Sequence, residues 1–150
     1  MSRLLPETPA PTSPAPKQGG TWGRRLYAFW KFSRPHTIIG TSLSVIGIFL
    51  VTLAAAPGNA LPPPSSVLPT LVACLCGNVY IVGLNQIEDV AIDRINKPHL
   101  PLASGEFSQR QAWAIVAITG TLALLLAFWQ GTFLFAMVGI SLAIGTAYSL

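Results

Sequence analysis

Residues 85–108 of this 150-residue chain read NQIEDVAIDRINKPHLPLASGEFS. This stretch holds most of the chain's acidic residues, yet long apolar runs precede and follow it. Charged side chains are expensive to bury in an apolar medium, so their concentration between two such runs needs an explanation. The rest of the chain is interpreted outward from this point.

Asn85, Asp89 and Asp93 recur at every fourth position of the stretch. If the preceding apolar run continues as a helix, their side chains share one face. Two carboxylates at this spacing repel each other by roughly 0.2–0.5 kcal/mol unless a cation lies between them. Carboxylate and amide oxygens are ligands that suit Mg²⁺, so the spacing is compatible with a magnesium site. On spacing alone, a solvated helix end is the more common interpretation.

The composition predicts an all-α membrane protein. Hydrophobic residues make up 51% of the chain and charged residues 9%, whereas roughly a quarter of the residues in soluble domains are charged. Only helices and closed barrels satisfy the backbone in lipid, and about 20 apolar residues span a bilayer as a helix. Four stretches without Asp, Glu, Lys or Arg have this length, namely residues 38–56, 67–84, 112–129 and 132–150.

The basic residues lie beside these spans. The net charge of +4 therefore indicates contact with a lipid bilayer and not with nucleic acid. Lysines and arginines precede the first span or lie between the second and third, and the connections at 57–66 and 130–131 carry none. The positive-inside rule then places the N-terminus and the 85–108 loop in the cytoplasm, and four spans return the chain to that side.

The N-terminal region divides into two parts. Residues 1–21 are rich in Pro, Ser, Thr and Ala and are predicted to be a disordered tail. Residues 22–35 alternate aromatic and basic side chains, which predicts a helix at the membrane interface. Its headgroup-level aromatic residues would be Trp22, Tyr27, Phe29, Trp30 and Phe32.

The second span has no helix-breaking residue before the 85–108 stretch. The helix is therefore predicted to continue to Ile95 or Asn96, because Pro98 disfavours helical geometry at Lys97. A loop follows, and Ser108 with Gln111 has the spacing of a capping box at the start of the third span.

Pairs of small residues occur in two spans. Gly40 and Ser44 lie four apart in the first span, as do Gly139 and Ala143 in the fourth, with Ser141 and Gly145 beside them. Small residues at this spacing let helix backbones approach closely. Both spans are therefore predicted to pack against other helices.

The amino-acid sequence of residues 85–108 closely resembles the first aspartate-rich motif of the UbiA superfamily of intramembrane prenyltransferases. Asn85-Gln86, Asp89 and Asp93 are followed by NKP at 96–98 and LPLASG at 100–105, as in the homogentisate prenyltransferase branch. Three further segments also resemble this family, namely FWKFSRPHTIIGTSLSV at 29–45, GNVYIVGLNQ at 77–86 and GISLAIGTAYS at 139–149. The resemblance covers nearly all of residues 29–150 and implies that residues 22–150 are the N-terminal part of a UbiA-type helical bundle.

The resemblance also implies an activity. The enzyme would transfer a phytyl group from phytyl diphosphate to homogentisate with loss of CO₂, a step of tocopherol synthesis in a photosynthetic bacterial or plastid membrane. Asp89 and Asp93 would be catalytic and, with Asn85, would hold Mg²⁺ and the diphosphate. Arg94 and Lys97 would be further diphosphate contacts.

The chain departs from the family pattern in two respects. Ala91 stands where relatives commonly have an acidic residue. More importantly, family members carry a second aspartate-rich motif in their C-terminal half, and no Asp or Glu follows Glu106 here. We therefore expect the chain to correspond to an N-terminal half that needs the missing half of the bundle as its partner, and to be inactive alone.

Two alternatives remain open. The chain could be a small non-catalytic membrane protein that binds a divalent cation or a partner at its loop. It could also be a UbiA-type prenyltransferase with another aromatic acceptor or another prenyl donor, because the residues that set donor length line a cavity that this chain contains only in part.

Overall fold

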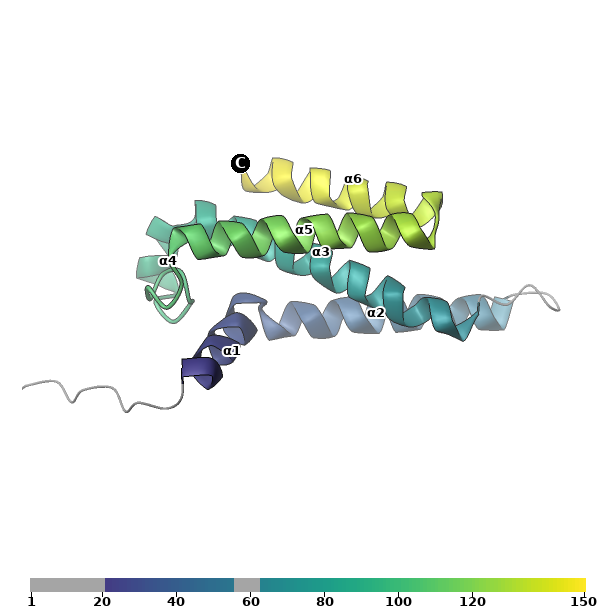
Figure 1. The fold of residues 1–150 in the computed structure, drawn as a ribbon, viewed down its shortest axis with the longest axis horizontal. Coiled ribbons are helices and arrows are strands. Elements are labelled where there is room, and N and C mark those ends of the chain that lie inside the picture. The colour runs from purple at the N-terminus through teal and green to yellow at the C-terminus, as the bar shows by residue number, and fades with distance from the viewer. Residues whose placement is uncertain (1–20, 56–62) are drawn as a thin grey trace, which may run out of the picture.

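The computed structural model describes residues 21–55 and 63–150 of the chain (Figure 1). Within these ranges every regular element is a helix, as predicted. Residues 1–20 of the predicted tail lie outside the described residues, and Thr21 is already helical. The elements are α1 (Thr21–Phe32), α2 (Pro35–Ala55), the short 3₁₀ helix η1 (Pro64–Ser66), α3 (Val67–Glu88), α4 (Val90–Asn96), α5 (Gln109–Gln130) and α6 (Thr132–Ser149).

Four of these helices, α2, α3, α5 and α6, are long and apolar enough to cross a membrane. They contain between 18 and 22 residues each, close to the roughly 20 that a bilayer core requires. They coincide with the four predicted spans and confirm a helical membrane bundle.

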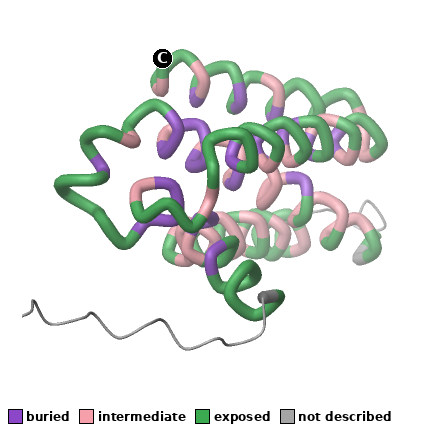
Figure 2. The backbone as a smooth tube through the Cα atoms, turned by 60° about the vertical axis from the view of Figure 1, so that its left-hand side comes forward, coloured by how far each residue is buried: buried purple, intermediate pink, exposed green. Residues whose placement is uncertain are grey.

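Helix α3 lies at the centre of the arrangement and contacts α2, α5 and α6 (Figure 1). Its core positions are occupied largely by small or branched residues such as Ala73, Gly77 and Val79. Buried residues gather on α3 and α5, whereas α2 has none (Figure 2). The packed part of the bundle is therefore α3 with α5 and α6.

Close helix packing involves three glycines, of which Gly145 is among the small residues named in the fourth span and the other two are not. A Cβ atom at Gly120 would lie 2.6 Å from a ring atom of Tyr80, and one at Gly145 would lie 2.6 Å from Ile81. A Cβ at Gly83 would lie 2.7 Å from a methyl group of Val116. A side chain at any of these positions would therefore force the opposite side chain to shift, and glycine allows the helices to approach this closely.

The first and fourth spans pack against other helices as predicted, but of the small residues named only Gly145 lies at a close contact. A Cβ atom at Gly40 or Gly139 would meet nothing within 4 Å among the described residues, and Ser44 and Ala143 are exposed. Helix α6 does pack, but through Val138, Leu142 and Gly145 on another face. Spacing identifies small residues and does not say which of them has a large side chain opposite.

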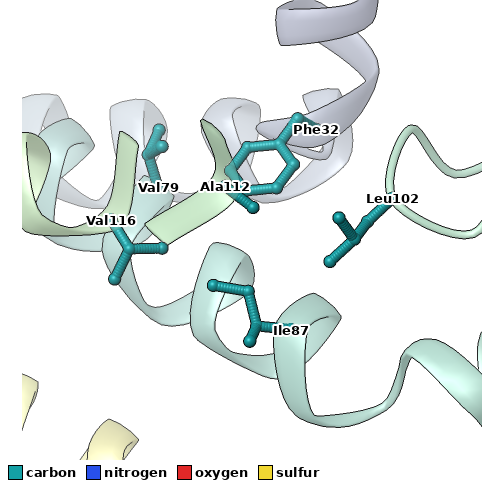
Figure 3. Close-up of a cluster of buried hydrophobic side chains, with 6 residues drawn as sticks. All are labelled: Phe32, Val79, Ile87, Leu102, Ala112 and Val116. Atoms are coloured by element: carbon teal, nitrogen blue, oxygen red, sulfur yellow. The ribbon is translucent and has the colours of Figure 1, made fainter. Parts of the chain in front are cut away.

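One core cluster lies at the end of the bundle where α3 is followed by α4 and by the loop of residues 97–108. We call this end of the bundle the loop end. Phe32 is fully buried there and has Phe107 edge-to-face at 5.7 Å between ring centroids. The predicted headgroup position of Phe32 is therefore wrong, although the other four aromatic residues are exposed as expected. The buried members of the cluster are Phe32, Val79, Ile87, Leu102, Ala112 and Val116 (Figure 3).

The N-terminal segment, the loop and the end of α6 meet at the loop end. Lys31 Nζ lies 2.6 Å from a carboxylate oxygen of Glu106, and Ser149 Oγ donates a hydrogen bond to Asn85. The chain turns sharply between α1 and α2 at Arg34, a non-glycine residue with φ of 51°. The hydrogen bond between Ser149 and Asn85 places the end of α6 beside the end of α3. This position agrees with the predicted return of the chain to one side after four spans.

Candidate functional site

The candidate motif lies on two helices instead of the single predicted one. Helix α3 ends at Glu88, Asp89 has φ −87° and ψ 10°, and α4 runs from Val90 to Asn96. Two hydrogen bonds of α-helical spacing remain at the break, since the Asp89 amide donates to the Asn85 carbonyl at 2.9 Å and the Asp93 amide donates to the Asp89 carbonyl at 2.8 Å. The helix is therefore interrupted at Asp89, whose ψ lies outside the helical range.

The predicted end of this helical segment is correct. The last helical residue is Asn96, and Lys97 has φ −140° and ψ 57° before Pro98. The steric conflict between the proline ring and a preceding helical residue accounts for this ending. The loop that follows folds back onto the bundle, because Leu100, Pro101 and Leu102 are buried.

Asp93 is the most unusual residue of the motif because its side chain is almost fully buried. Only 2% of the residue is exposed. Its Oδ1 atom accepts a hydrogen bond from Lys97 Nζ at 3.2 Å, and its Oδ2 atom has no partner among the described residues. A buried carboxylate with a free oxygen is costly unless a positive charge or a donor reaches it. This oxygen is therefore suited to a cationic ligand.

Asp89 and Asn85 have different surroundings. Asp89 is exposed, and no cation lies within 4 Å of it among the described residues. Asn85 is half-buried and accepts the hydrogen bond from Ser149 at the end of α6. The three side chains thus lie along one short segment but do not share one environment.

The two basic residues of the motif also have different surroundings. Lys97 pairs with Asp93, whereas Arg94 is exposed and lines an open pocket of about 390 Å³ with residues of the loop and of the start of α5. No group of three or more His, Cys, Asp and Glu side chains able to hold a metal occurs in residues 21–55 and 63–150. The two aspartates, with Asn85, are the candidate oxygen ligands.

Gln86, a residue of the motif to which the sequence assigned no role, connects the motif to the end of α1. Gln86 is 1% exposed and donates through Nε2 to the carbonyl oxygen of Phe32 at 2.8 Å and to that of Val82 at 3.2 Å. It therefore satisfies the carbonyl at the end of α1. No signal in the sequence distinguished it from the neighbouring polar residues Asn85 and Glu88.

The loop is closed at its other end as predicted. Ser108 Oγ accepts from the Gln111 amide at 3.3 Å, and the Gln111 side chain accepts from the Ser108 amide at 2.9 Å. This reciprocal pair is a capping box and begins α5. The loop is thus held by the Lys31–Glu106 pair, by its buried Leu-Pro-Leu segment and by this cap.

Comparison with known proteins identifies several relatives. A homogentisate phytyltransferase of Synechocystis sp. is 56% identical over 127 residues, which are 83% of this chain and 41% of that protein. Homogentisate phytyltransferase 1 of Arabidopsis thaliana, a chloroplastic protein, is 44% identical over 126 residues, 83% of this chain and 32% of that protein. The homogentisate solanesyltransferase of the same plant is 48% identical over 101 residues, 63% of this chain and 26% of that protein.

The chain therefore spans about two fifths or less of the length of these relatives. No solved structure matches it. Residues 44–150 match the model of the UbiA prenyltransferase family, and this match contains the whole candidate motif. Because the match covers most of the chain, the chain belongs to the UbiA prenyltransferase family.

Proposed function

We propose that the chain forms part of a homogentisate phytyltransferase, which transfers a phytyl group from phytyl diphosphate to homogentisate in tocopherol synthesis. The observation that carries the proposal is the 56% identity to a relative of that name. The buried carboxylate of Asp93 has one oxygen without a partner among the described residues, so it is suited to bind a cation.

The donor set fits a divalent metal, which we take to be Mg²⁺. Mg²⁺ is usually held by one or two protein carboxylates and completes its coordination with water and substrate phosphates. Asp89 and the free oxygen of Asp93 would supply the carboxylates, and Asn85 an amide oxygen. When bound, the metal would neutralise charge on the departing diphosphate.

The chain's own residues would assist in two ways. Arg94 and Lys97 would donate hydrogen bonds to diphosphate oxygens as the allylic carbon–oxygen bond breaks. The apolar spans would keep water away from the resulting allylic cation until a ring carbon of homogentisate captures it and releases its hydrogen as a proton. The side-chain carboxylate leaves as CO₂, and a proton takes its place on the side-chain carbon.

The relatives' names support the acceptor more strongly than the donor. Each of the three names homogentisate, but two name phytyl transfer and one names solanesyl transfer. A different prenyl donor is therefore the second candidate function.

The proposal includes a location and a partner. The cytoplasmic placement of the loop end rests on the clustering of lysines and arginines there, and a photosynthetic membrane on the chloroplastic relative. We further propose that the region which the relatives carry beyond the matched segment completes the site with a second aspartate-rich motif, so that the chain alone performs no transfer.

The test measures phytyl transfer to homogentisate in membranes that contain this chain joined to that further region of a relative. Asp89→Ala and Asp93→Ala should each lower the rate by roughly 100-fold or more, the usual loss when electrostatic stabilisation of a transition state is removed. Glu88→Ala is the matched control, because Glu88 is an exposed carboxylate beside Asp89 and should keep the rate. Wild-type rates in both aspartate variants across a Mg²⁺ titration would show that the metal assignment is wrong.

A further inference from the structure

Polar side chains from three membrane-spanning helices line one cavity of the bundle. The cavity has a volume of about 210 Å³ and lies between α2, α3 and α6. Thr41 of α2, Asn78 of α3 and Ser141 of α6 supply its hydrogen-bonding side chains, and no charged residue lines it. A polar side chain within a membrane span is costly unless it finds a partner. Their convergence on one cavity therefore favours a ligand that carries polar groups.

The hydrogen bonds around Asn78 fix the orientation of its side-chain amide. Thr37 Oγ1 donates its single proton to the carbonyl oxygen of Arg34 at 2.8 Å. It can therefore only accept from Asn78, which places the amide nitrogen Nδ2 toward Thr37 at 3.0 Å. The other branch of the amide is the oxygen Oδ1, and no residue in the described part of the chain donates to it. The cavity thus contains an acceptor that lacks a donor.

The two hydroxyl groups of the cavity complement this acceptor. The Thr41 hydroxyl makes no hydrogen bond within residues 21–55 and 63–150. Ser141 Oγ donates to the carbonyl oxygen of Met137 at 2.8 Å and keeps its lone pairs for a further donor. Hydroxyl groups of a ligand fit this set, because they both donate and accept. A diphosphate or a carboxylate would find no cation in the cavity.

The cavity has a size and a position that suit an aromatic ring. A cavity of roughly 150 Å³ is known to hold benzene, so the larger volume here accommodates one substituted ring. Asn78 precedes Asn85 by seven residues of α3. This is almost two helical turns, so both side chains lie on the same side of α3, about 10 Å apart along its axis. The cavity therefore follows the candidate motif along one side of α3, toward the interior of the membrane.

We propose that this cavity binds the dihydroxyphenyl ring of homogentisate, with a ring hydroxyl donating to Asn78 Oδ1 and accepting from the Thr41 hydroxyl. Ser141 is a further acceptor, contributed by α6. The inference rests on the proposed function for the identity of the acceptor substrate. The prenyl tail lies elsewhere in the bundle, because a chain without donors would leave Asn78 Oδ1 unpaired.

The test measures the binding of homogentisate and not its prenylation. Equilibrium dialysis of radiolabelled homogentisate against the full chain in detergent micelles, with empty micelles as the blank, gives the dissociation constant. Thr41→Val and Asn78→Leu should each raise this constant by roughly 10-fold, the effect of one lost hydrogen bond. Thr41→Val breaks no hydrogen bond within the described part of the chain, so a loosened helix would not explain its effect. Phenylacetate, which lacks the ring hydroxyls, should bind at least roughly 10-fold more weakly than homogentisate and equally to all three chains.

Thr52→Val is the matched control. Thr52 also lies on α2, but its hydroxyl donates to the carbonyl oxygen of Ile48 at 2.9 Å and it does not line the cavity. Its loss should leave both dissociation constants unchanged. The proposal is overturned if the wild-type chain binds no homogentisate above the blank, if it binds phenylacetate as tightly, or if both cavity variants bind homogentisate as the wild type does. Homogentisate binding as expected, together with no phytyl transfer in the joined protein, would instead contradict the proposed function alone.

Discussion

The two sides of α3 differ in how they hold the bundle together. Toward α5 and α6, α3 presents large side chains to glycines, with Tyr80 against Gly120 and Ile81 against Gly145. Toward α2, no residue of α2 becomes buried, and Asn78 donates a hydrogen bond to Thr37 at 3.0 Å. Close packing therefore defines α3, α5 and α6 as one unit. The N-terminal segment is held mainly at its junction, where Phe32 enters the core.

The largest effect is expected at Phe32, because it anchors the lightly packed side. Phe32→Ala should destabilise the chain by about 3–5 kcal/mol, the usual cost of removing a buried phenylalanine side chain. Phe29→Ala is the control on the same helix, where Phe29 is 40% exposed, and should cost much less. Unfolding of the full chain by denaturing detergent in mixed micelles, followed by circular dichroism, measures both. Equal losses would mean that α1 is not fixed through Phe32.

Glycine substitutions test the two sides directly. Gly120→Ala places a Cβ atom 2.6 Å from Tyr80, whose hydroxyl is engaged with Thr146 at 2.8 Å, so the ring has to shift. The expected loss of stability is about 1–3 kcal/mol, as for other overpacked cores. The added methyl group of Gly40→Ala meets nothing within 4 Å in the described part of the chain, so the change should be neutral or stabilising by up to about 1 kcal/mol, because alanine favours helix. The same micelle titration distinguishes them, and a costly Gly40→Ala would reveal a contact on α2.

A smaller effect is expected at the start of α5. Ser108→Ala removes the capping box that closes the loop and should cost about 1 kcal/mol. Ser108→Asp retains a side-chain acceptor for the Gln111 amide and should keep most of the stability. Hydrogen exchange of the first-turn amides of α5 measures the local effect. Unchanged exchange in Ser108→Ala would show that the cap does not hold this end of the helix.

The smallest effect is expected at the contact between α2 and α3. A double-mutant cycle of Thr37→Val and Asn78→Leu should give a coupling of about 0.6 kcal/mol, the average for hydrogen bonds between membrane helices. Each single variant provides the control for the other, since only their non-additivity reports the bond. A coupling several times larger would show that α2 depends on this bond more than its lack of buried residues indicates.

Several local features could be predicted from the sequence because their causes lie within a few residues. The end of α4 at Asn96 follows from Pro98, and the start of α5 follows from the Ser108 and Gln111 pair. The break at Asp89 was not predicted, because neither a proline nor a glycine marks it.

The candidate site was predicted as a set of residues and not as an arrangement. Equal spacing suggested that Asn85, Asp89 and Asp93 lie on one face of a helix. In the structure Asp93 is buried and Asp89 is exposed, and the Asn85 side chain accepts a hydrogen bond from Ser149 of α6. Burial depends on how the rest of the chain packs around each position, which spacing does not encode. For the same reason the role of Gln86 in holding the end of α1 was not predicted.

The sequence alone determined the four spans, because an unpaired backbone group in lipid costs several kcal/mol and every apolar run of sufficient length must become a helix. The motif at residues 85–108 also identified the family from the sequence alone. Only the tertiary structure decided which glycines lie at helix contacts, that Phe32 belongs to the core, and that Asp93 is the buried carboxylate. These depend on which side chain lies opposite each position, and that is set by contacts between residues far apart in the chain.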